Sequence, residues 1–193
     1  AAAVTGTANA VRRTADGRLY AENFDGRGFV DGLTAAGRPL RDAHVFVAGA
    51  GGAGGAIAAA GLAAGAARVV LRDPDGARLA GLLGRLDARW PGRAGAAGPD
   101  DLGRADVVVN ATPLGMRAAD PLPFDPAAAR PDAVVADVVM KPHETALLRA
   151  AAARGRRVHH GIHMLEQQVP AYREFFGWLR PDPAAAARKS GMA

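Results

Sequence analysis

Residues 49–54 read Gly-Ala-Gly-Gly-Ala-Gly, with glycines at the first, third and sixth positions. A strand pattern precedes this segment and a helix of small residues follows it. In that context Gly49 can make a tight turn, Gly51 lets the backbone approach a pyrophosphate, and Gly54 lets helix and strand pack closely. The helix N-terminus adds free N–H groups and a partial positive charge. We therefore predict a dinucleotide-binding loop with these cofactor-binding residues: Gly49, Gly51, Gly52, Ala53 and Gly54.

An acidic residue follows the next expected strand, at the position that would meet the adenosine ribose. Such a residue, about 20 positions beyond the glycines, accepts hydrogen bonds from the ribose hydroxyls of NAD and repels the 2′-phosphate of NADP. Asp73 occupies this position. Its neighbour Arg72 could instead clamp the phosphate, and Asp73 could simply cap the following helix. The sequence favours NAD over NADP as the cofactor.

Strand and helix patterns alternate through the centre of the chain. The strands are continuously apolar, which is typical of a parallel sheet covered by helices on both faces. We predict an α/β fold with a Rossmann-like, doubly wound parallel sheet. Its expected strands are 44–48, 68–71, 106–110, 133–138 and 157–159, and its expected helices are 56–64, 76–90 and 145–153.

Other elements lie outside this alternation. A hairpin is expected around Asp16-Gly17, because that pair favours a tight turn. A short helix is expected from Gly28, and a long one over 164–178. Residues 91–103 are rich in glycine and proline and receive no assignment, and the tail after Pro181 is expected to fray.

Composition excludes several function classes. The net charge is +5, but the arginines are scattered among acidic residues, so no nucleic-acid partner is predicted. Glycine, arginine and aspartate interrupt every apolar run, so no membrane partner is predicted either. The chain has no cysteine, which excludes thiol catalysis and fits a cytoplasmic location.

Two further features concern the histidines and the start of the chain. His159, His160 and His163 lie close together in the sequence, but they have no carboxylate partners at a metal-binding spacing. We therefore predict no metal site. The chain begins with alanines rather than methionine, and we expect a longer protein with an N-terminal part before residue 1.

Five segments, in this order, resemble the shikimate/quinate dehydrogenase family. The ordered set is more specific than any single match, and NATPLGM is its most distinctive member. The segments are TANA at 7–10, ENFDGRGF at 22–29, GAGGAG at 49–54, NATPLGM at 110–116 and GIHMLEQQ at 161–168.

The resemblance implies roles for individual residues. It matches Asn9 to the asparagine that holds the ring hydroxyls of the substrate, and Asp25 to the aspartate that pairs with a catalytic lysine. It matches Gln168 to a glutamine that contacts the substrate. Each has a simpler interpretation: Asp25 as a turn residue, Asn9 as a partner of backbone groups, and Gln168 as a solvated helix residue. On the nicotinamide side of the cofactor, the resemblance places Asn110, Thr112, Pro113 and Met116.

The resemblance also implies a division of the chain about a cleft between two domains. Residues 1–28 would end a second α/β domain that binds substrate, and residues 29–160 would form the dinucleotide-binding domain. Residues 161–193 would return as a helix to the substrate domain. The fold would then carry remnants of that second domain at both ends.

The chain departs from the family pattern in ways that affect chemistry. Its two lysines, Lys141 and Lys189, both lie outside the family's lysine motif, so no catalytic lysine is assigned. Phe24 and Met140 stand where a threonine and a tyrosine are usual. Asp73-Pro74-Asp75 replaces the Asn-Arg-Thr clamp that binds NADP in many members.

These observations predict an NAD(P)-dependent oxidoreductase. It would interconvert a shikimate- or quinate-like hydroxy acid and its 3-dehydro ketone by hydride transfer, acting as a monomer or homodimer on a small-molecule substrate. The alternative is a non-catalytic dinucleotide-binding module or sensor.

Overall fold

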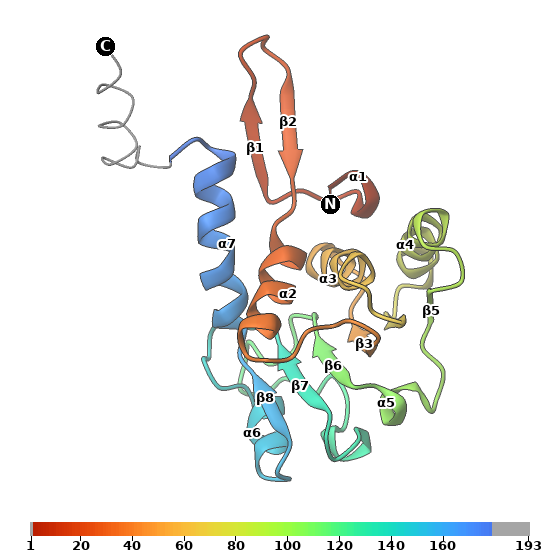
Figure 1. Ribbon diagram of the computed structural model, residues 1–193. Helices are drawn as coiled ribbons and strands as arrows, with labels where there is room; N and C mark the ends of the chain where they lie inside the picture. The colour runs from red at the N-terminus through yellow and green to blue at the C-terminus, as the bar shows by residue number, and fades with distance from the viewer. Residues whose placement is uncertain (1, 179–193) are drawn as a thin grey trace.

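The structure of the chain is a computed structural model that describes residues 2–178. The centre of the chain forms a six-stranded sheet. Neighbouring strands all pair in parallel, in the order β5-β4-β3-β6-β7-β8. The order reverses between β3 and β6, so the doubly wound sheet predicted from the sequence is confirmed (Figure 1). The strands are β3 (His44–Ala48), β4 (Arg68–Arg72), β5 (Ala94–Ala96), β6 (Val107–Asn110), β7 (Val134–Asp137) and β8 (Arg157–His159).

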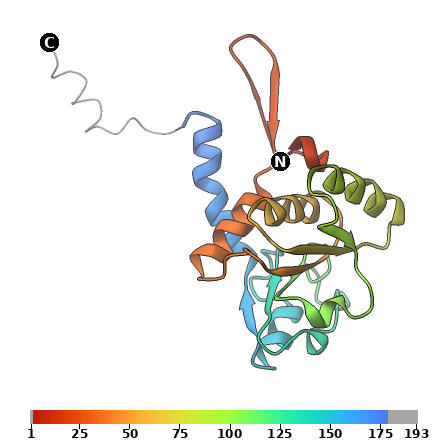
Figure 2. The same cartoon turned by 45° about the vertical axis from the view of Figure 1, so that its right-hand side comes forward.

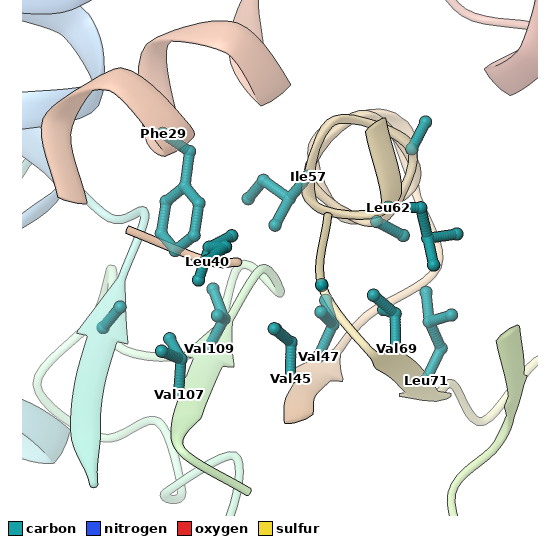
Figure 3. Close-up of a cluster of buried hydrophobic side chains, with 14 of the residues drawn as sticks. Phe29, Leu40, Val45, Val47, Ile57, Leu62, Val69, Leu71, Val107 and Val109 are labelled. Carbon is teal, nitrogen blue, oxygen red and sulfur yellow. The ribbon is translucent and has the colours of Figure 1, made fainter. Parts of the chain in front are cut away.

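The central residues of β3, β4, β6 and β7 are apolar and buried because both faces of the sheet are covered. Alternate residues of a strand point to opposite faces. Val45 and Val47 therefore belong to one buried cluster, which Figure 3 shows under helical residues such as Ile57. Phe46 and Ala48, from the same strand, belong to a second cluster on the other face.

The helices divide between these two clusters. On the first face lie α2 (Asp25–Ala35), α3 (Gly52–Ala63), α4 (Gly76–Arg89) and the start of α7 (Gly161–Phe175). On the second lie α5 (Asp101–Arg104), the 3₁₀ turn η1 (Pro126–Ala128) and α6 (Ala146–Ala152). None of the helices between residues 2 and 178 is long and apolar enough to cross a membrane.

The predicted hairpin is confirmed and stands away from the sheet. It consists of β1 (Ala10–Arg13) and β2 (Leu19–Glu22), and Gly17 in its turn has a φ of +81°. Figure 2 shows it projecting beyond the α/β body beside α7. Its base is joined to α7 by a small buried cluster that includes Ala10, Phe24 and Ala171.

Several element boundaries differ from the sequence predictions. Helix α3 begins at Gly52 rather than at residue 56, because the glycine segment itself supplies its first turn. Helix α2 begins three residues before Gly28, and α7 occupies 161–175 rather than 164–178. The unassigned segment 91–103 contains β5 and the start of α5, and a short helix α1 (Ala2–Thr5) was not predicted. The tail expected to fray after Pro181 lies outside the described residues.

Two glycines of α2 bring three helices into backbone contact. A Cβ at Gly26 would lie 2.0 Å from the carbonyl oxygen of Ala56 in α3. A Cβ at Gly28 would lie 2.4 Å from the carbonyl oxygen of Met164 in α7. Because real Cβ atoms do not approach so closely, α2 can sit between α3 and α7 only with glycine at both positions.

We expect Gly26→Ala to lower the free energy of unfolding by about 1–3 kcal/mol, because the added methyl group overpacks the contact with Ala56. Gly84→Ala is the matched control, since Gly84 lies inside α4 and a Cβ there would meet nothing within 4 Å. That control should raise stability by up to about 1 kcal/mol through helix propensity. Urea unfolding measures both, and two effects of the same sign would contradict the packing account.

Candidate functional site

A cavity of about 620 Å³ opens at the carboxyl ends of β3, β4 and β6, where the strand order reverses. This is the position at which doubly wound sheets bind their ligands. Three segments line it. They are the glycine turn with Gly49, Gly51 and Gly52, the segment from the end of β4 into α4 with Asp73, Pro74 and Arg78, and the loop after β6 with residues 111–114 and Met116.

The glycines of the turn have the geometry that the motif requires. Gly49 has a φ of +102°, and a Cβ there would lie 2.7 Å from the carbonyl oxygen of Ala111. A Cβ at Gly54 would lie 2.0 Å from the carbonyl oxygen of Gly49, so this glycine allows α3 to pack against the turn. Gly51 faces open space and is the N-cap of α3 without a side-chain cap. The first N–H groups of α3 therefore point at the cavity mouth without intrahelical partners.

Two residues predicted in this loop are not part of the cavity lining. Gly54 is buried behind the turn, and Ala53 is partly exposed on α3. The loop residues that face the cavity are Gly49, Gly51 and Gly52.

Asp73 lies in the cavity wall and ties the end of β4 to the glycine turn. Its Oδ2 accepts a hydrogen bond of 2.7 Å from the N–H of Ala50, and its Oδ1 accepts one of 2.8 Å from the N–H of Asp75. Burial alone would raise the pKa of Asp73, but these N–H groups and the guanidinium of Arg78 hold it below its usual value. Asp73 is therefore an ionised carboxylate with 4% of its side chain exposed.

The interpretation of Asp73 as a helix cap is wrong. The N-cap of α4 is Asp75, whose carboxylate accepts a hydrogen bond of 2.9 Å from the N–H of Arg78. Arg78 then closes the group, with its guanidinium 3.4 Å from Asp73 and 3.1 Å from Asp75. The sequence analysis did not single out Arg78, although its position in the first turn after two acidic residues could have marked it.

Arg72 points away from the cavity. Its Nη2 donates a hydrogen bond of 2.8 Å to the carbonyl oxygen of Pro123. Its guanidinium also lies over the ring of Phe46, 5.3 Å from the centroid. The guanidinium of Arg72 is therefore held on the face of the sheet that carries the second buried cluster, by Pro123 and Phe46.

The loop after β6 forms the wall opposite Asp73. Thr112, Pro113 and Met116, predicted on the nicotinamide side, line the cavity. Asn110 is fully buried beneath them instead. Its Oδ1 accepts hydrogen bonds from the N–H and the hydroxyl of Thr112, at 3.0 and 2.6 Å, so Asn110 shapes this wall from below.

A second polar group joins the two ends of the chain. Asn9 and Gln168 both donate to Oδ1 of Asp25, over 2.8 and 3.1 Å. The structure thus brings together the three residues that the family resemblance matched to the substrate site. Burial raises the pKa of Asp25, and the hydrogen bonds from Gln168 and Asn9 oppose that rise.

The simpler interpretations of these residues fare differently. Gln168 is 4% exposed, so its interpretation as a solvated helix residue is wrong. Asn9 does bind backbone, because its Oδ1 accepts from the N–H of Phe24 at 3.0 Å, but its amide nitrogen still reaches Asp25. Asp25 begins α2 rather than serving only in a turn.

The sequence analysis missed Asn23, which supports Asp25 from behind. Asn23 is 3% exposed, and its Oδ1 accepts a hydrogen bond of 3.0 Å from the N–H of Asp25. Its Nδ2 donates to Thr7 Oγ1 over 3.1 Å. A Cβ at Gly52 would lie 3.9 Å from that same hydroxyl, so the Asp25 group adjoins the glycine turn.

Four of the five histidines gather where α7 begins. The rings of His143 and His160 stack at 4.7 Å, and those of His159 and His163 lie 5.0 Å apart. Burial, with smaller effects from His163 and His160, lowers the pKa of His159 to about 4. Among residues 2–178, no group of three or more histidine or acidic side chains is arranged to hold a metal ion.

Comparison with known proteins gives a consistent set of relatives. The chain is 41% identical to the shikimate dehydrogenase (NADP(+)) of Rubrobacter xylanophilus, over all of this chain and 69% of the relative. It is 40% identical to the protein of that name from Azorhizobium caulinodans, over 84% of this chain and 59% of the relative. The chain thus spans about 59–69% of these two relatives. No protein-family model matches the chain.

Solved structures agree with these relatives. Quinate dehydrogenase from Corynebacterium glutamicum in complex with NAD superposes with a TM-score of 0.80 at 36% identity, over 94% of this chain and 66% of that one. Shikimate 5-dehydrogenase from Thermus thermophilus in complex with NADP(H) and shikimate gives 0.78 at 33% identity, over 97% and 70%.

We expect Asp25→Asn to stabilise the chain at pH 7, because folding raises the pKa of Asp25 and so disfavours its ionised form. The amide oxygen of asparagine can still accept from Asn9 and Gln168. The gain should shrink as the pH falls through the folded pKa of Asp25, and vanish below the usual aspartate value of about 3.9. Urea unfolding of both proteins between about pH 7 and pH 3.5 measures this. A gain that is independent of pH would contradict the electrostatic cause.

Proposed function

The chain belongs to the shikimate dehydrogenase family of NAD(P)-dependent oxidoreductases. We propose that it binds NAD in preference to NADP and presents the bound NAD to a cyclic hydroxy acid. Asp73 is the observation that carries the cofactor preference. It places an ionised carboxylate in the cavity wall, beside the glycine turn. A negative charge there favours ribose hydroxyls and repels a 2′-phosphate.

The surrounding cations support the same preference. Arg72, the alternative phosphate clamp, is held by Pro123 and Phe46. Arg78 lines the cavity, but Asp73 and Asp75 together more than balance its charge. The two curated relatives are named as NADP(+) enzymes, whereas the quinate dehydrogenase was solved with NAD. We therefore propose that this chain differs from the named relatives in its cofactor.

The Asp25 group supports the proposed substrate class. A polyhydroxy ring acid presents several hydroxyl groups, and Asn9, Asp25 and Gln168 supply amide and carboxylate partners for them. Among the described contacts, both hydrogen bonds to Asp25 fall on Oδ1, which leaves Oδ2 to accept from a substrate hydroxyl. These partners come from both ends of the chain, which supports assigning 1–28 and 161–193 to the substrate side of a cleft and 29–160 to the dinucleotide side.

Hydride transfer requires two events at one alcohol group. The carbon loses a hydride, for which a dinucleotide held at the glycine turn would be the acceptor, and the oxygen loses a proton. Asp25 can orient the hydroxyl and stabilise a neighbouring protonated base, but its own proton affinity is too low to deprotonate an alcohol unaided. That step belongs to a lysine in the family. Lys141 is exposed in the loop after β7, and Lys189 lies outside the described residues.

We expect the 193-residue chain to bind the dinucleotide but to show little or no turnover of shikimate or quinate. The physical reason is that neither lysine matches the family's catalytic motif, so proton removal is uncatalysed. Appearance of NADH absorbance on mixing chain, NAD and either acid measures turnover. Ready turnover that Asp25→Asn abolishes would refute this prediction and favour an enzyme over a non-catalytic binding module.

We expect calorimetric titration to give tighter binding of NAD than of NADP, and Asp73→Ala to weaken NAD binding about tenfold or more. Loss of a hydrogen bond to a charged group costs about 1.5–3 kcal/mol, and 1.4 kcal/mol is tenfold in affinity. The same variant should bind NADP no more weakly than the parent, because the repulsive charge is removed.

Asp31→Ala is the matched control, since it removes the same charge from a partly exposed residue of α2 whose ion-pair partner is Arg27. It should leave both affinities unchanged. Tighter binding of NADP by the parent chain would overturn the cofactor proposal and assign Arg78 to the phosphate.

A further inference from the structure

We propose that the buried carboxylate of Asp137 is a positioning residue for the cavity wall formed by residues 111–116. In this role Asp137 fixes the side chains of Asn110 and Thr145, on which that wall rests. The proposal concerns the nicotinamide half of the dinucleotide, and it rests on the proposed dinucleotide binding.

Asp137 ends β7 and is 1% exposed, so its carboxylate is fully inside the protein. It does not line the cavity, and within residues 2–178 no cation lies within ion-pair distance of it. An aspartate buried without such a partner is costly unless hydrogen bonds satisfy it. The hydrogen bonds around Asp137 must therefore offset the cost of burying its carboxylate.

Three donors from three segments satisfy the carboxylate. Oδ1 accepts from Asn110 Nδ2 and from the N–H of Val139, both at 3.0 Å. Oδ2 accepts from the Thr145 hydroxyl at 2.7 Å. Burial raises the pKa of Asp137, and these three donors together with His160 oppose the rise. The carboxylate thus joins the end of β6, the loop after β7 and the first turn of α6.

The first consequence concerns the orientation of Asn110. Oδ1 of Asp137 accepts hydrogen bonds, so Asn110 turns its amide nitrogen toward Asp137. Its oxygen then faces Thr112, where it accepts from both the N–H and the hydroxyl. The amide nitrogen also donates to the carbonyl oxygen of Leu114 at 2.8 Å. Thr112 and Leu114, two lining residues, are therefore held through an amide that Asp137 orients.

The second consequence concerns Thr145, which supports the same wall at Gly115. A Cβ at Gly115 would lie 3.5 Å from Cβ and Cγ2 of Thr145, and Gly115 has a φ of +104°. The Thr145 hydroxyl donates to Asp137 and accepts from the N–H of Leu148 as the cap of α6. The backbone turn that presents Met116 to the cavity therefore passes directly over a side chain that Asp137 holds.

Asp137→Asn tests this arrangement with little change in shape. The new amide group would present a donor where Thr145 now donates, so the bond between the two side chains must reorganise. Thr145→Val removes the hydroxyl while keeping the volume, and Thr145→Ser is the matched control that keeps the hydroxyl. Should Asp137→Asn fail to fold, as checked by urea unfolding, the two Thr145 variants carry the test by themselves.

Comparing the binding of two ligands distinguishes effects on the two halves of the cavity. NADH reports on the whole site through its affinity and its nicotinamide fluorescence, whereas ADP-ribose contains everything except the nicotinamide. We expect Asp137→Asn and Thr145→Val to weaken NADH binding at least fivefold and to reduce the gain in nicotinamide fluorescence when NADH binds. ADP-ribose affinity should change less than twofold, and Thr145→Ser should match the parent for both ligands.

A general loosening of the fold would weaken the binding of NADH and of ADP-ribose equally, and that result would overturn the proposal. Unchanged NADH affinity and fluorescence in folded variants would overturn it as well. Failure of the parent chain to bind either ligand would instead refute the proposed dinucleotide function, and this proposal with it. Asp137 is supported as a positioning residue if the variants lose affinity for NADH but keep the parent's affinity for ADP-ribose.

Discussion

The reversal of strand order between β3 and β6 is the constraint on which the rest of the molecule depends. At that point the two neighbouring connections leave the sheet toward opposite faces, so no helix covers the carboxyl ends of these strands. The glycine turn and the loop after β6 meet there, close enough for a Cβ at Gly49 to contact Ala111. Asp73, Arg78 and Thr112 line that opening.

Three aspartates near the opening show how environment divides one residue type into different tasks. Asp73 is surrounded by N–H donors and an arginine, and its pKa falls, which keeps a permanent negative charge in the wall. Asp25 and Asp137 are dominated by burial, and their pKa values rise. Asp25 accepts from Asn9 and Gln168 on Oδ1 alone, whereas Asp137 accepts from three donors on both of its oxygens.

The sequence predicted the fold because local patterns determined it, and the structure brings predicted site residues together around Asp25 and along the cavity. Strand alternation, the turn at Asp16-Gly17 and the glycine spacing each act within a few residues, and each was confirmed. The edge strand β5, of Ala94-Gly95-Ala96, could not be predicted in that way, because its small residues have little strand preference and only pairing with β4 orders them. The roles of Asn23, Arg78 and Asp137 also depend on contacts that only the folded chain provides.

The two glycine contacts of α2 have a mechanical consequence. Helices that meet through interdigitated side chains can slide past one another by small shear movements, whereas backbone pressed on backbone leaves no such freedom. At Gly26 and Gly28, α2 meets α3 and α7 in the second way. The helix that begins at the glycine turn and the helix that carries Gln168 are therefore coupled as one rigid block. Any change in the distance between the glycine turn and Gln168 would therefore have to break the contacts that α2 makes at Gly26 or Gly28.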